Sequence, residues 1–157
     1  MKVGIVMGSK SDLPVMRHTS DILSNLDIEH KMIVLSAHRT PDETAKWAKS
    51  AQSDGYGVII CGAGMAAHLA GAVAAHTLLP VIGVPVGSSL LGIDSLLSTV
   101  QMPPGVPVAT VGVGAAGAKN AAWLAAEIVA LKSDYVRIRL VEARDAMRKK
   151  VLEALEV

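Results

Sequence analysis

Two short polar segments carry the residue types that an enzyme needs to hold an anion and to move a proton. One reads Gly8-Ser9-Lys10-Ser11-Asp12 and the other reads Ser36-Ala37-His38-Arg39. Each follows a short apolar run and precedes a segment with helical spacing. A loop in that position presents backbone N–H groups and the positive end of a helix dipole, which together favour a phosphate.

The first segment has two interpretations. The hydroxyls of Ser9 and Ser11 add donors for an anion, whereas Asp12 would repel a phosphate and suits hydrogen bonds from ribose hydroxyls. Serine and aspartate are also common helix N-caps, so Ser11 or Asp12 could simply cap the following helix. The first segment alone leaves binding and capping equally open.

The second segment adds a cation and a proton carrier. Arg39 has a planar guanidinium that can fork onto a phosphate, and histidine exchanges protons near neutral pH. Most histidines do no chemistry, so His38 taken alone is typical of a hydrogen-bonded loop residue. Parallel strands place their following loops at one edge of the sheet, and a position beside the anion-binding loop favours an acid–base role for His38.

Two glycine-rich segments imitate a dinucleotide fingerprint. Residues 62–67 fit G-x-G-x-x-A, and residues 112–117 fit G-x-G-x-x-G. The acidic residue expected about 20 positions after the first motif is missing, and the second motif precedes helical segments rather than a strand. We therefore expect no dinucleotide cofactor, although both loops could surround a smaller ligand through backbone groups.

Other catalytic classes lack their signatures. His38, His68 and His76 do not have the spacing of metal ligands, and no thiol or carboxylate cluster joins them, so we expect no metal. A Walker A sequence and Gly-x-Ser-x-Gly are both absent, which argues against ATP use and against the simplest serine hydrolases. The small residues of segment 66–72 favour close helix packing as its main role.

Short β-branched runs alternate with helical periodicity along the chain. Strands are expected at 2–7, 31–35, 58–61, 81–84 and 106–111, and helices at 13–26, from Thr40-Pro41 onward, 66–76, 93–101 and 118–131. The second of these helices is expected to start with Thr40 as its N-cap, Pro41 at N1 and Glu43 at N3. This alternation predicts a parallel sheet of about five strands with helices on both faces and ligands at the carboxyl ends of the strands. A charged amphipathic helix follows at 135–155, and we expect it to pack on a neighbouring subunit.

Length and composition limit the class of protein. The 157 residues suit one domain, 1–157, that buries on the order of 70% of its unfolded surface. Fifteen basic residues balance fourteen acidic ones and aromatic residues are 3%, which argues against nucleic acid as a partner. Residues 55–93 contain no Asp, Glu, Lys or Arg, but their glycines and prolines argue against a membrane span.

Location and assembly follow from the same composition. The single Cys61 and the absence of a signal-like start predict a cytoplasmic protein. Hydrophobic residues make up 51% of the chain and charged residues 18%, so a lone small domain would expose apolar patches. We therefore expect a homo-oligomer.

Four motifs, in order and at consistent spacing, resemble the PurE family. They are Met7-Gly8-Ser9-Lys10-Ser11-Asp12, Ser36-Ala37-His38-Arg39-Thr40-Pro41, Gly62-Ala63-Gly64 with Ala66-Ala67-His68-Leu69, and Asp94-Ser95-Leu96-Leu97-Ser98 through Val100-Gln101-Met102-Pro103. The resemblance covers residues 2 to 131. The Ala-His-Arg-Thr-Pro and Ala-Ala-His-Leu forms are similar to the class I enzymes, the N5-carboxyaminoimidazole ribonucleotide mutases, rather than to the class II carboxylases.

The resemblance implies a flavodoxin-like, three-layer αβα subunit in an octamer. It implies a step of purine biosynthesis without a cofactor, in which a carboxyl group moves from the exocyclic nitrogen of N5-carboxyaminoimidazole ribonucleotide to ring carbon C4. The phosphate and ribose contacts of the family fall on Ser9, Ser11, Asp12, Ser36 and Arg39. The catalytic histidine falls on His38, and further substrate contacts are expected at Gly64, Ala66, His68 and Leu69.

The chain departs from the family pattern near the third motif. Family members usually have a second glycine where this chain has Met65 and a proline where it has Ala70, and the 86–92 loop is one residue short. We expect Met65 to change the region that would hold CO₂ and the migrating carboxylate, while the proton-transfer group stays intact.

Three other functions fit part of the pattern: direct carboxylation of aminoimidazole ribonucleotide by CO₂, a dinucleotide-dependent oxidoreductase, and a non-catalytic nucleotide-binding module.

Overall fold

A computed structural model describes residues 1–87 and 90–154. The strands are β1 (Lys2–Met7), β2 (His30–Val34), β3 (Tyr56–Gly64), β4 (Val81–Val86) and β5 (Ala109–Thr110). A short 3₁₀ helix, η1 (Lys10–Asp12), leads into α1 (Leu13–Asn25), and the other helices are α2 (Pro41–Ser50), α3 (Leu69–Ala74), α4 (Ile93–Val100), α5 (Gly114–Ala130) and α6 (Asp134–Glu153).

The five strands form one parallel sheet in the order β2-β1-β3-β4-β5. The chain leaves β1 in one direction to reach β2 and returns past β1 to reach β3, so the strand order switches at β1. An open parallel sheet binds ligands outside the carboxyl ends of its strands at such a switch point. The predicted parallel sheet of about five strands is confirmed, and the loop after β1 lies at the switch point.

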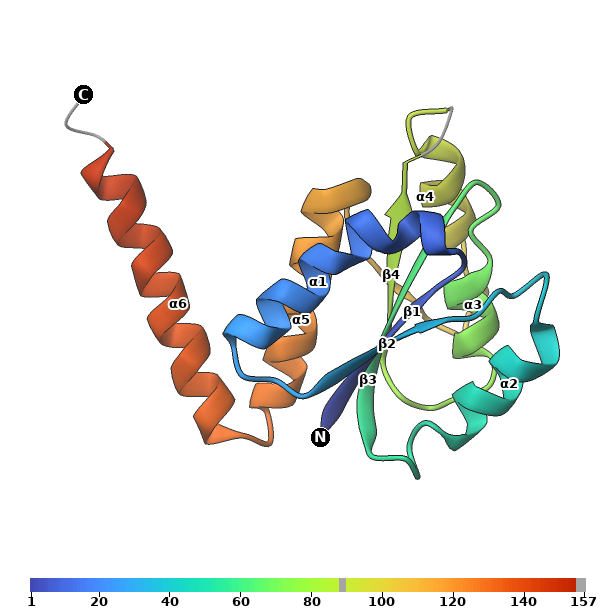
Figure 1. Cartoon of the computed structure of the whole chain (residues 1–157), viewed down its shortest axis with the longest axis horizontal. Helices are drawn as coiled ribbons and strands as arrows, with labels where there is room; N and C mark the ends of the chain where they lie inside the picture. Colours follow the sequence, from blue (N-terminus) through green and yellow to red (C-terminus); the bar gives the residue numbers. More distant parts are fainter. Residues whose placement is uncertain (88–89, 155–157) are drawn as a thin grey trace.

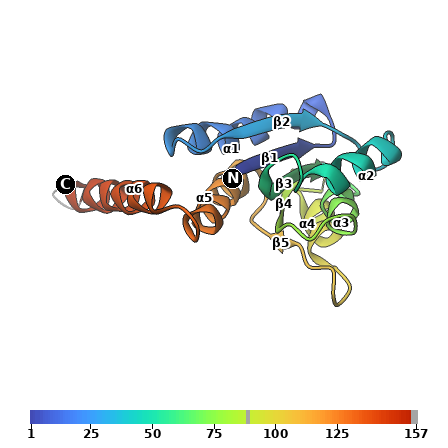
Figure 2. The ribbon, with the colours of Figure 1, turned by 90° about the horizontal axis from the view of Figure 1, so that it is seen from below.

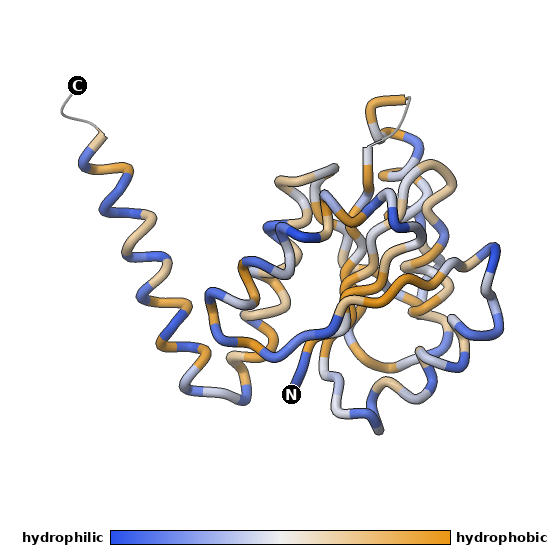
Figure 3. Tube along the Cα trace, viewed as in Figure 1, coloured by the Kyte–Doolittle hydropathy of each residue, from blue (hydrophilic) through white to orange (hydrophobic). Residues whose placement is uncertain are grey.

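Helices cover both faces of the sheet. Figures 1 and 2 show α1 and α5 on one face and α2, α3 and α4 on the other. Two buried clusters correspond to these faces, one centred on Ile5, Ile60 and the alanines of α5, the other on Val6, Ile59 and the small residues of α2 and α3. Figure 3 accordingly shows apolar residues concentrated on the strands. The three-layer αβα prediction is confirmed.

Several predicted elements differ in extent. β3 (Tyr56–Gly64) and β4 (Val81–Val86) are longer than the strands expected at 58–61 and 81–84. The strand expected at 106–111 is reduced to Ala109–Thr110, because Pro107 lacks an N–H and Gly105 turns the chain with a positive φ of 93°. The helix expected at 66–76 is shorter, Leu69–Ala74, because residues 65–68 fold into tight turns instead. Helix α5 begins at Gly114, four residues before the expected start at 118.

Helix α5 lies close to the sheet because its buried face consists of small residues. Ala118, Ala121, Ala122, Ala125 and Ala126 are fully buried. At its start, a Cβ on Gly117 would overlap the carbonyl oxygen of Gly112. The second dinucleotide-like motif, 112–117, therefore includes a close backbone contact that positions α5. Among the described residues, no helix has both the length and the apolar character that a membrane crossing requires.

Gly117→Ala should lower the free energy of unfolding by about 3 kcal/mol, because the added methyl overpacks a rigid backbone contact. Ala116→Gly is the matched control: its side chain is exposed, and the change should cost only about 1 kcal/mol of helix propensity. Urea unfolding of both variants measures the difference. Equal costs at the two positions would contradict the close contact.

Candidate active site

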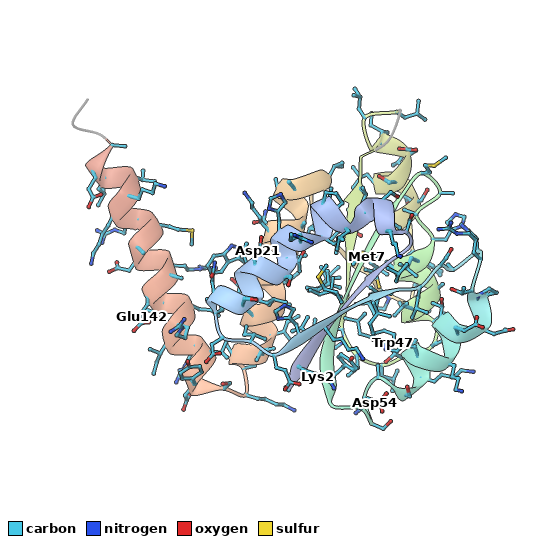
Figure 4. The ribbon with its side chains drawn as sticks, viewed as in Figure 1. Lys2, Met7, Asp21, Trp47, Asp54 and Glu142 are labelled. Atoms are coloured by element: carbon cyan, nitrogen blue, oxygen red, sulfur yellow. The ribbon has the colours of Figure 1, made fainter. Side chains whose placement is uncertain are left out.

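One pocket of about 560 Å³ lies at the carboxyl edge of the sheet. The strand ends that surround it are held in line, since the Gly8 N–H donates to the Gly62 carbonyl at 3.1 Å and the Leu35 N–H donates to the Met7 carbonyl at 3.0 Å. Figure 4 labels Met7 at this end of β1. The pocket is lined by Gly8, Ser9, Ser11, Asp12, Ser36, Ala37, His38, Arg39, Ala63, Gly64, Met65, Ala66, His68, Leu69, Val86 and Gly87.

The loop after β1 is closed by a capping box. Ser9 is the N-cap of η1, and its hydroxyl accepts a hydrogen bond from the Ser11 N–H at 3.3 Å. The carboxylate of Asp12 accepts from the Ser9 N–H at 3.0 Å. The predicted capping by Ser11 or Asp12 is therefore wrong in its residue, because the side-chain cap is Ser9 and belongs to η1. Asp12 occupies the N-cap position of α1 but makes no side-chain capping hydrogen bond there. Capping does not exclude binding, because all three residues also line the pocket.

Burial changes the acidity of Asp12. The side chain is largely removed from water, and this desolvation raises the pKa of the carboxyl. The hydrogen bond from the Ser9 N–H and the positive charge of Arg39 act in the opposite direction and lower the pKa, but they do not cancel the effect of burial. The pocket thus has an acidic group whose pKa is raised mainly by burial and is lowered in part by the neighbouring arginine.

Arg39 ties the loop after β2 to the loop after β1. One guanidinium nitrogen donates to the Gly8 carbonyl at 2.8 Å. The Arg39 N–H donates to the Ser36 hydroxyl at 3.2 Å, and Nε lies 3.5 Å from the same oxygen. These contacts use only part of the guanidinium, whose five N–H groups form a planar fork. The side chain therefore keeps donors for an anionic ligand.

Thr40 has a different role from the predicted helix cap. It occupies the N-cap position of α2, but its side chain makes no capping hydrogen bond. The hydroxyl instead accepts from the Ser36 N–H at 2.9 Å and donates to the Ser36 carbonyl at 3.1 Å. The predicted helix start is confirmed, with Thr40 at the N-cap position and Pro41 first in α2, but the side-chain cap is absent because the hydroxyl is engaged with Ser36 at the edge of the pocket.

Two histidines meet in the pocket. His38 Nε2 lies 2.9 Å from His68 Nδ1, and the ring planes are nearly perpendicular at 78°. One of these nitrogens must carry a proton and the other must accept it, because two N–H groups or two lone pairs would repel each other. The close-packing role predicted for segment 66–72 does not account for this contact between His68 and His38, and His68 lines the pocket.

The third loop carries backbone strain. Met65 has a φ of 56°, in the left-handed region, and its side chain is 68% exposed at the pocket. A residue with a Cβ pays on the order of 1–2 kcal/mol in this conformation, whereas glycine does not. The N–H groups of Ala67 and His68 donate within the loop, to the carbonyls of Met65 and Ala66. Only the N–H groups of Met65 and Ala66 then remain for an anion.

The end of β4 supplies the fourth wall of the pocket, through Val86 and Gly87. The buried hydroxyl of Ser95 lies 2.9 Å from both the Val86 and the Gly92 carbonyl oxygens. The 94–103 motif thus helps to shape the end of this strand from outside the pocket. The shortened 86–92 loop lies partly outside the described residues, which exclude 88 and 89.

The structure brings all ten predicted site residues to one pocket. Sequence reasoning missed Gly8, Ala37, Ala63, Val86 and Gly87 as lining residues. The first three lie next to predicted residues, and the last two are signalled only by their place at the end of β4. Lys10 lines a smaller hollow of about 350 Å³ that shares Gly8, Ser9, Ser36 and Arg39 with the pocket.

Other parts of the described structure bring together fewer residues that could act in catalysis or bind a metal. The 112–117 motif does not line the pocket. A hollow of about 880 Å³ lies at the opposite edge of the sheet, beside His76 and Lys49, and brings no acid or second imidazole to them. Within residues 1–87 and 90–154, no three His, Cys, Asp or Glu side chains gather where they could hold a metal ion.

The chain is similar to known proteins along almost all of its length. The family described as AIR carboxylase matches residues 2–150. A protein of Pyrococcus abyssi named N5-carboxyaminoimidazole ribonucleotide mutase is 54% identical over 94% of this chain and 84% of its own length. The proteins of that name from Escherichia coli K12 and Bacillus subtilis are each 53% identical over 97% of this chain, and over 90% and 94% of their own lengths.

The fold has a solved counterpart. The crystal structure of Treponema denticola PurE superimposes with a TM-score of 0.87 at 28% identity, covering 96% of this chain and 94% of that one. The flavodoxin-like arrangement expected from the sequence is thus confirmed by an experimental structure as well as by the strand order.

Met65→Gly should be more stable than Met65→Ala by about 1 kcal/mol, because only glycine relieves the left-handed backbone while both variants remove the thioether. Urea unfolding at neutral pH measures the two free energies. An alanine variant as stable as the glycine variant would show that residue 65 is not strained.

Arg39→Gln should raise the pKa of the Asp12 carboxyl further above its usual range, because the variant removes the positive charge that lowers it. A pH titration of the Asp12 carboxyl carbon by NMR measures the change. Lys10→Gln, which removes a cation from the same loop, is the control and should leave the Asp12 titration unchanged. An unaltered titration in Arg39→Gln would contradict the proposed coupling.

Proposed function

This chain belongs to the AIR carboxylase family, also called PurE, and on that premise we propose that it is an N5-carboxyaminoimidazole ribonucleotide mutase of purine biosynthesis. Residues 1–157 would form one catalytic domain. The reaction moves a carboxyl group from the exocyclic nitrogen of the substrate to ring carbon C4. The observation that carries the proposal is the pair His38–His68, set 2.9 Å apart beside two loops suited to an anion.

The substrate's phosphate and ribose would be held by the first two loops. Ser9 and Ser11 hydroxyls and the donors of Arg39 suit the phosphate, with Ser36 holding Arg39 in place. Asp12 would accept hydrogen bonds from ribose hydroxyls. Since Arg39 lines both the main pocket and the hollow beside Lys10, it can contact a phosphate placed in either of them.

The reaction requires one proton to leave a carbon and one to reach a nitrogen. We assign both transfers to His38. As the N–CO₂⁻ bond breaks, protonated His38 donates to the exocyclic nitrogen and leaves aminoimidazole ribonucleotide and CO₂ in the pocket. Ring carbon C4 then attacks the CO₂ carbon, and His38 removes the C4 proton. Atoms and electrons balance without an oxidant, a reductant or ATP, and positioned proton transfer contributes about 10²–10⁴-fold.

His68 fits this cycle as the partner of His38. A protonated His38 can donate to the lone pair on His68 Nδ1, while a neutral His38 can accept from a protonated His68 Nδ1. The pair can thus hold a single proton in either arrangement. His68 would orient the His38 ring and, with Gly64, Ala66 and Leu69, would contact the substrate.

The third loop would hold CO₂ and the migrating carboxylate. Residues 63–67 have no polar side chain, which keeps that wall poor in water. The Met65 and Ala66 N–H groups, which the tight turns leave available, are suited to a carboxylate. Met65, in place of the usual family glycine, adds a flexible apolar side chain to this wall of the pocket and would narrow the region or change how it closes.

The family description favours one other reaction, direct carboxylation of aminoimidazole ribonucleotide by CO₂. The names of relatives that share more than half of the sequence favour the mutase. The two differ in one measurable way, because a carboxylase needs added bicarbonate and a mutase receives its carboxyl group with the substrate.

We also propose that the enzyme works in the cytoplasm as a homo-octamer. The buried free thiol of Cys61 and the many exposed large apolar side chains of the single chain support these assignments.

His38→Asn should lower turnover by about 10²–10⁴-fold, because the variant keeps a polar side chain and removes the proton carrier. The measurement supplies synthetic N5-carboxyaminoimidazole ribonucleotide without ATP or added bicarbonate and follows the C4-carboxylated product. His76→Asn, at the opposite edge of the sheet, is the matched control and should keep wild-type turnover. Circular dichroism checks that both variants fold.

Each outcome is informative. Wild-type turnover by His38→Asn would overturn the assignment of His38. No product from the wild-type enzyme would overturn the mutase proposal, and product that forms only with bicarbonate would favour the carboxylase. Tight nucleotide binding without turnover in either assay would favour a non-catalytic module.

A further inference from the structure

The smaller hollow beside Lys10 adjoins the candidate active site, and we call it the Lys10 hollow. It measures about 350 Å³ and is lined by Gly8, Ser9, Lys10, Val34, Ser36, Arg39 and Thr40. Four of these residues also line the main pocket, namely Gly8, Ser9, Ser36 and Arg39. One ligand can therefore extend from the main pocket into the Lys10 hollow.

The Lys10 hollow has two cations and no acid in its lining. The cations are Lys10 and Arg39, and among residues 1–87 and 90–154 neither forms an ion pair with a carboxylate. The main pocket differs, because Asp12 lines it. The whole chain has a net charge of only +1, so this excess of positive charge is a local feature that attracts anions.

Two hydroxyls in the lining of the Lys10 hollow have a proton to donate. The Ser9 hydroxyl accepts from the Ser11 N–H at 3.3 Å. The Ser36 hydroxyl accepts from the Arg39 N–H at 3.2 Å. Neither hydroxyl donates to another described residue, whereas the Thr40 hydroxyl donates to the Ser36 carbonyl at 3.1 Å. A hydroxyl has one proton and two lone pairs, so Ser9 and Ser36 can each donate to a ligand.

We propose that the Lys10 hollow binds a second phosphoryl group, so that the site takes nucleoside 5′-diphosphates in addition to its monophosphate substrate. The inference rests on the proposed function, which places a nucleotide phosphate beside Ser9 and Arg39. The group that extends a 5′-phosphate in a nucleotide is another phosphoryl group. Lys10 offers that group an ammonium charge, and Arg39, which lines both spaces, has N–H donors for both phosphoryl groups.

The substrate's own phosphate is the other ligand that the Lys10 hollow could hold. The lining residues favour the main pocket for that phosphate, because the Ser11 hydroxyl lines the main pocket and does not line the hollow. The two placements predict different effects of removing Lys10. A lysine that contacts only the second phosphoryl group affects diphosphates alone, whereas a lysine that contacts the substrate's phosphate affects both ligands.

A bound diphosphate excludes the substrate. Its ribose and first phosphate occupy the main pocket, beside Asp12 and Arg39, where the substrate's ribose and phosphate would lie. The Lys10 hollow therefore makes the enzyme sensitive to nucleoside diphosphates, a class of ligand that takes no part in the reaction itself.

Calorimetric titration without Mg²⁺ compares two ligands, aminoimidazole ribonucleoside 5′-monophosphate and its 5′-diphosphate. The wild type should bind the diphosphate about 10-fold more tightly, the effect of one typical hydrogen bond between charged groups. Lys10→Gln should remove most of this preference and keep the affinity for the monophosphate, which also shows that the variant folds. Lys10→Arg keeps the positive charge and should keep the preference.

Lys49→Gln is the matched control, because Lys49 lines the hollow at the opposite edge of the sheet. This variant should bind both ligands as the wild type does. Turnover gives a second measurement. The diphosphate should raise the KM of the wild type without changing kcat, and about 10-fold more of it should be needed for the same effect on Lys10→Gln.

Three results would overturn the proposal. They are equal affinity of the wild type for the two ligands, a preference for the diphosphate that survives in Lys10→Gln, and an equal loss of affinity for both ligands in Lys10→Gln. The third result would place the substrate's own phosphate in the Lys10 hollow. A wild type that binds neither nucleotide would overturn the proposed function and this inference with it.

Discussion

The parallel register of β1 between β2 and β3 is the constraint on which the rest of this molecule depends. Met7 pairs with Val34 on one side and with Gly62 on the other, so β1 and β2 end at the same level and β3 continues two residues further, to Gly64. The polar residues of the candidate site all lie on the loops that follow these three strands. A slip of one residue in either pairing would move each side chain of the strand from one helix-covered face of the sheet to the other and would shift the loops relative to each other.

Hydrogen bonds to backbone groups hold the first two loops together and leave other side-chain donors free to contact a ligand. The Gly8 carbonyl accepts a hydrogen bond from the Arg39 guanidinium. The Thr40 hydroxyl accepts from the Ser36 N–H and donates to the Ser36 carbonyl. The capping box of Ser9 and Asp12 likewise serves the local fold first. These contacts fix the loops that carry Arg39 and His38 without any ligand, and pre-organisation of this kind is a main source of catalytic power in enzymes.

The close packing of α5 on the sheet uses small residues and leaves many large apolar side chains on the surface. Alanines and Gly117 bring α5 close to the sheet, which leaves little volume for large core side chains there. Many large apolar side chains are instead on the outside of the single chain, on α4 and along α6. In the hydropathy colouring of Figure 3, α6 alternates between apolar and polar residues along its whole length. Such a surface is typical of a subunit rather than of a solitary domain.

The sequence by itself determined the strand and helix alternation, the sheet, and the identity of the loops that meet. These features depend on hydrophobic periodicity and on turn and N-cap residues next to each element. Such signals are local in the sequence and can therefore be recognised without the structure. The ten predicted site residues lie in one pocket because a parallel sheet brings the carboxyl ends of its strands to one edge. The resemblance of four motifs to one family sharpened this prediction from an anion site to a nucleotide site.

Only the tertiary structure decided which atoms meet. The contact of His38 with His68, thirty positions away, and that of Arg39 with Gly8 depend on strand order and side-chain rotamers, which local patterns do not encode. The true role of Thr40 and the left-handed backbone of Met65 also come from contacts across loops. The short β5 and α3 show the same limit, because proline, glycine and tight turns overrode β-branched and helical periodicity at their ends.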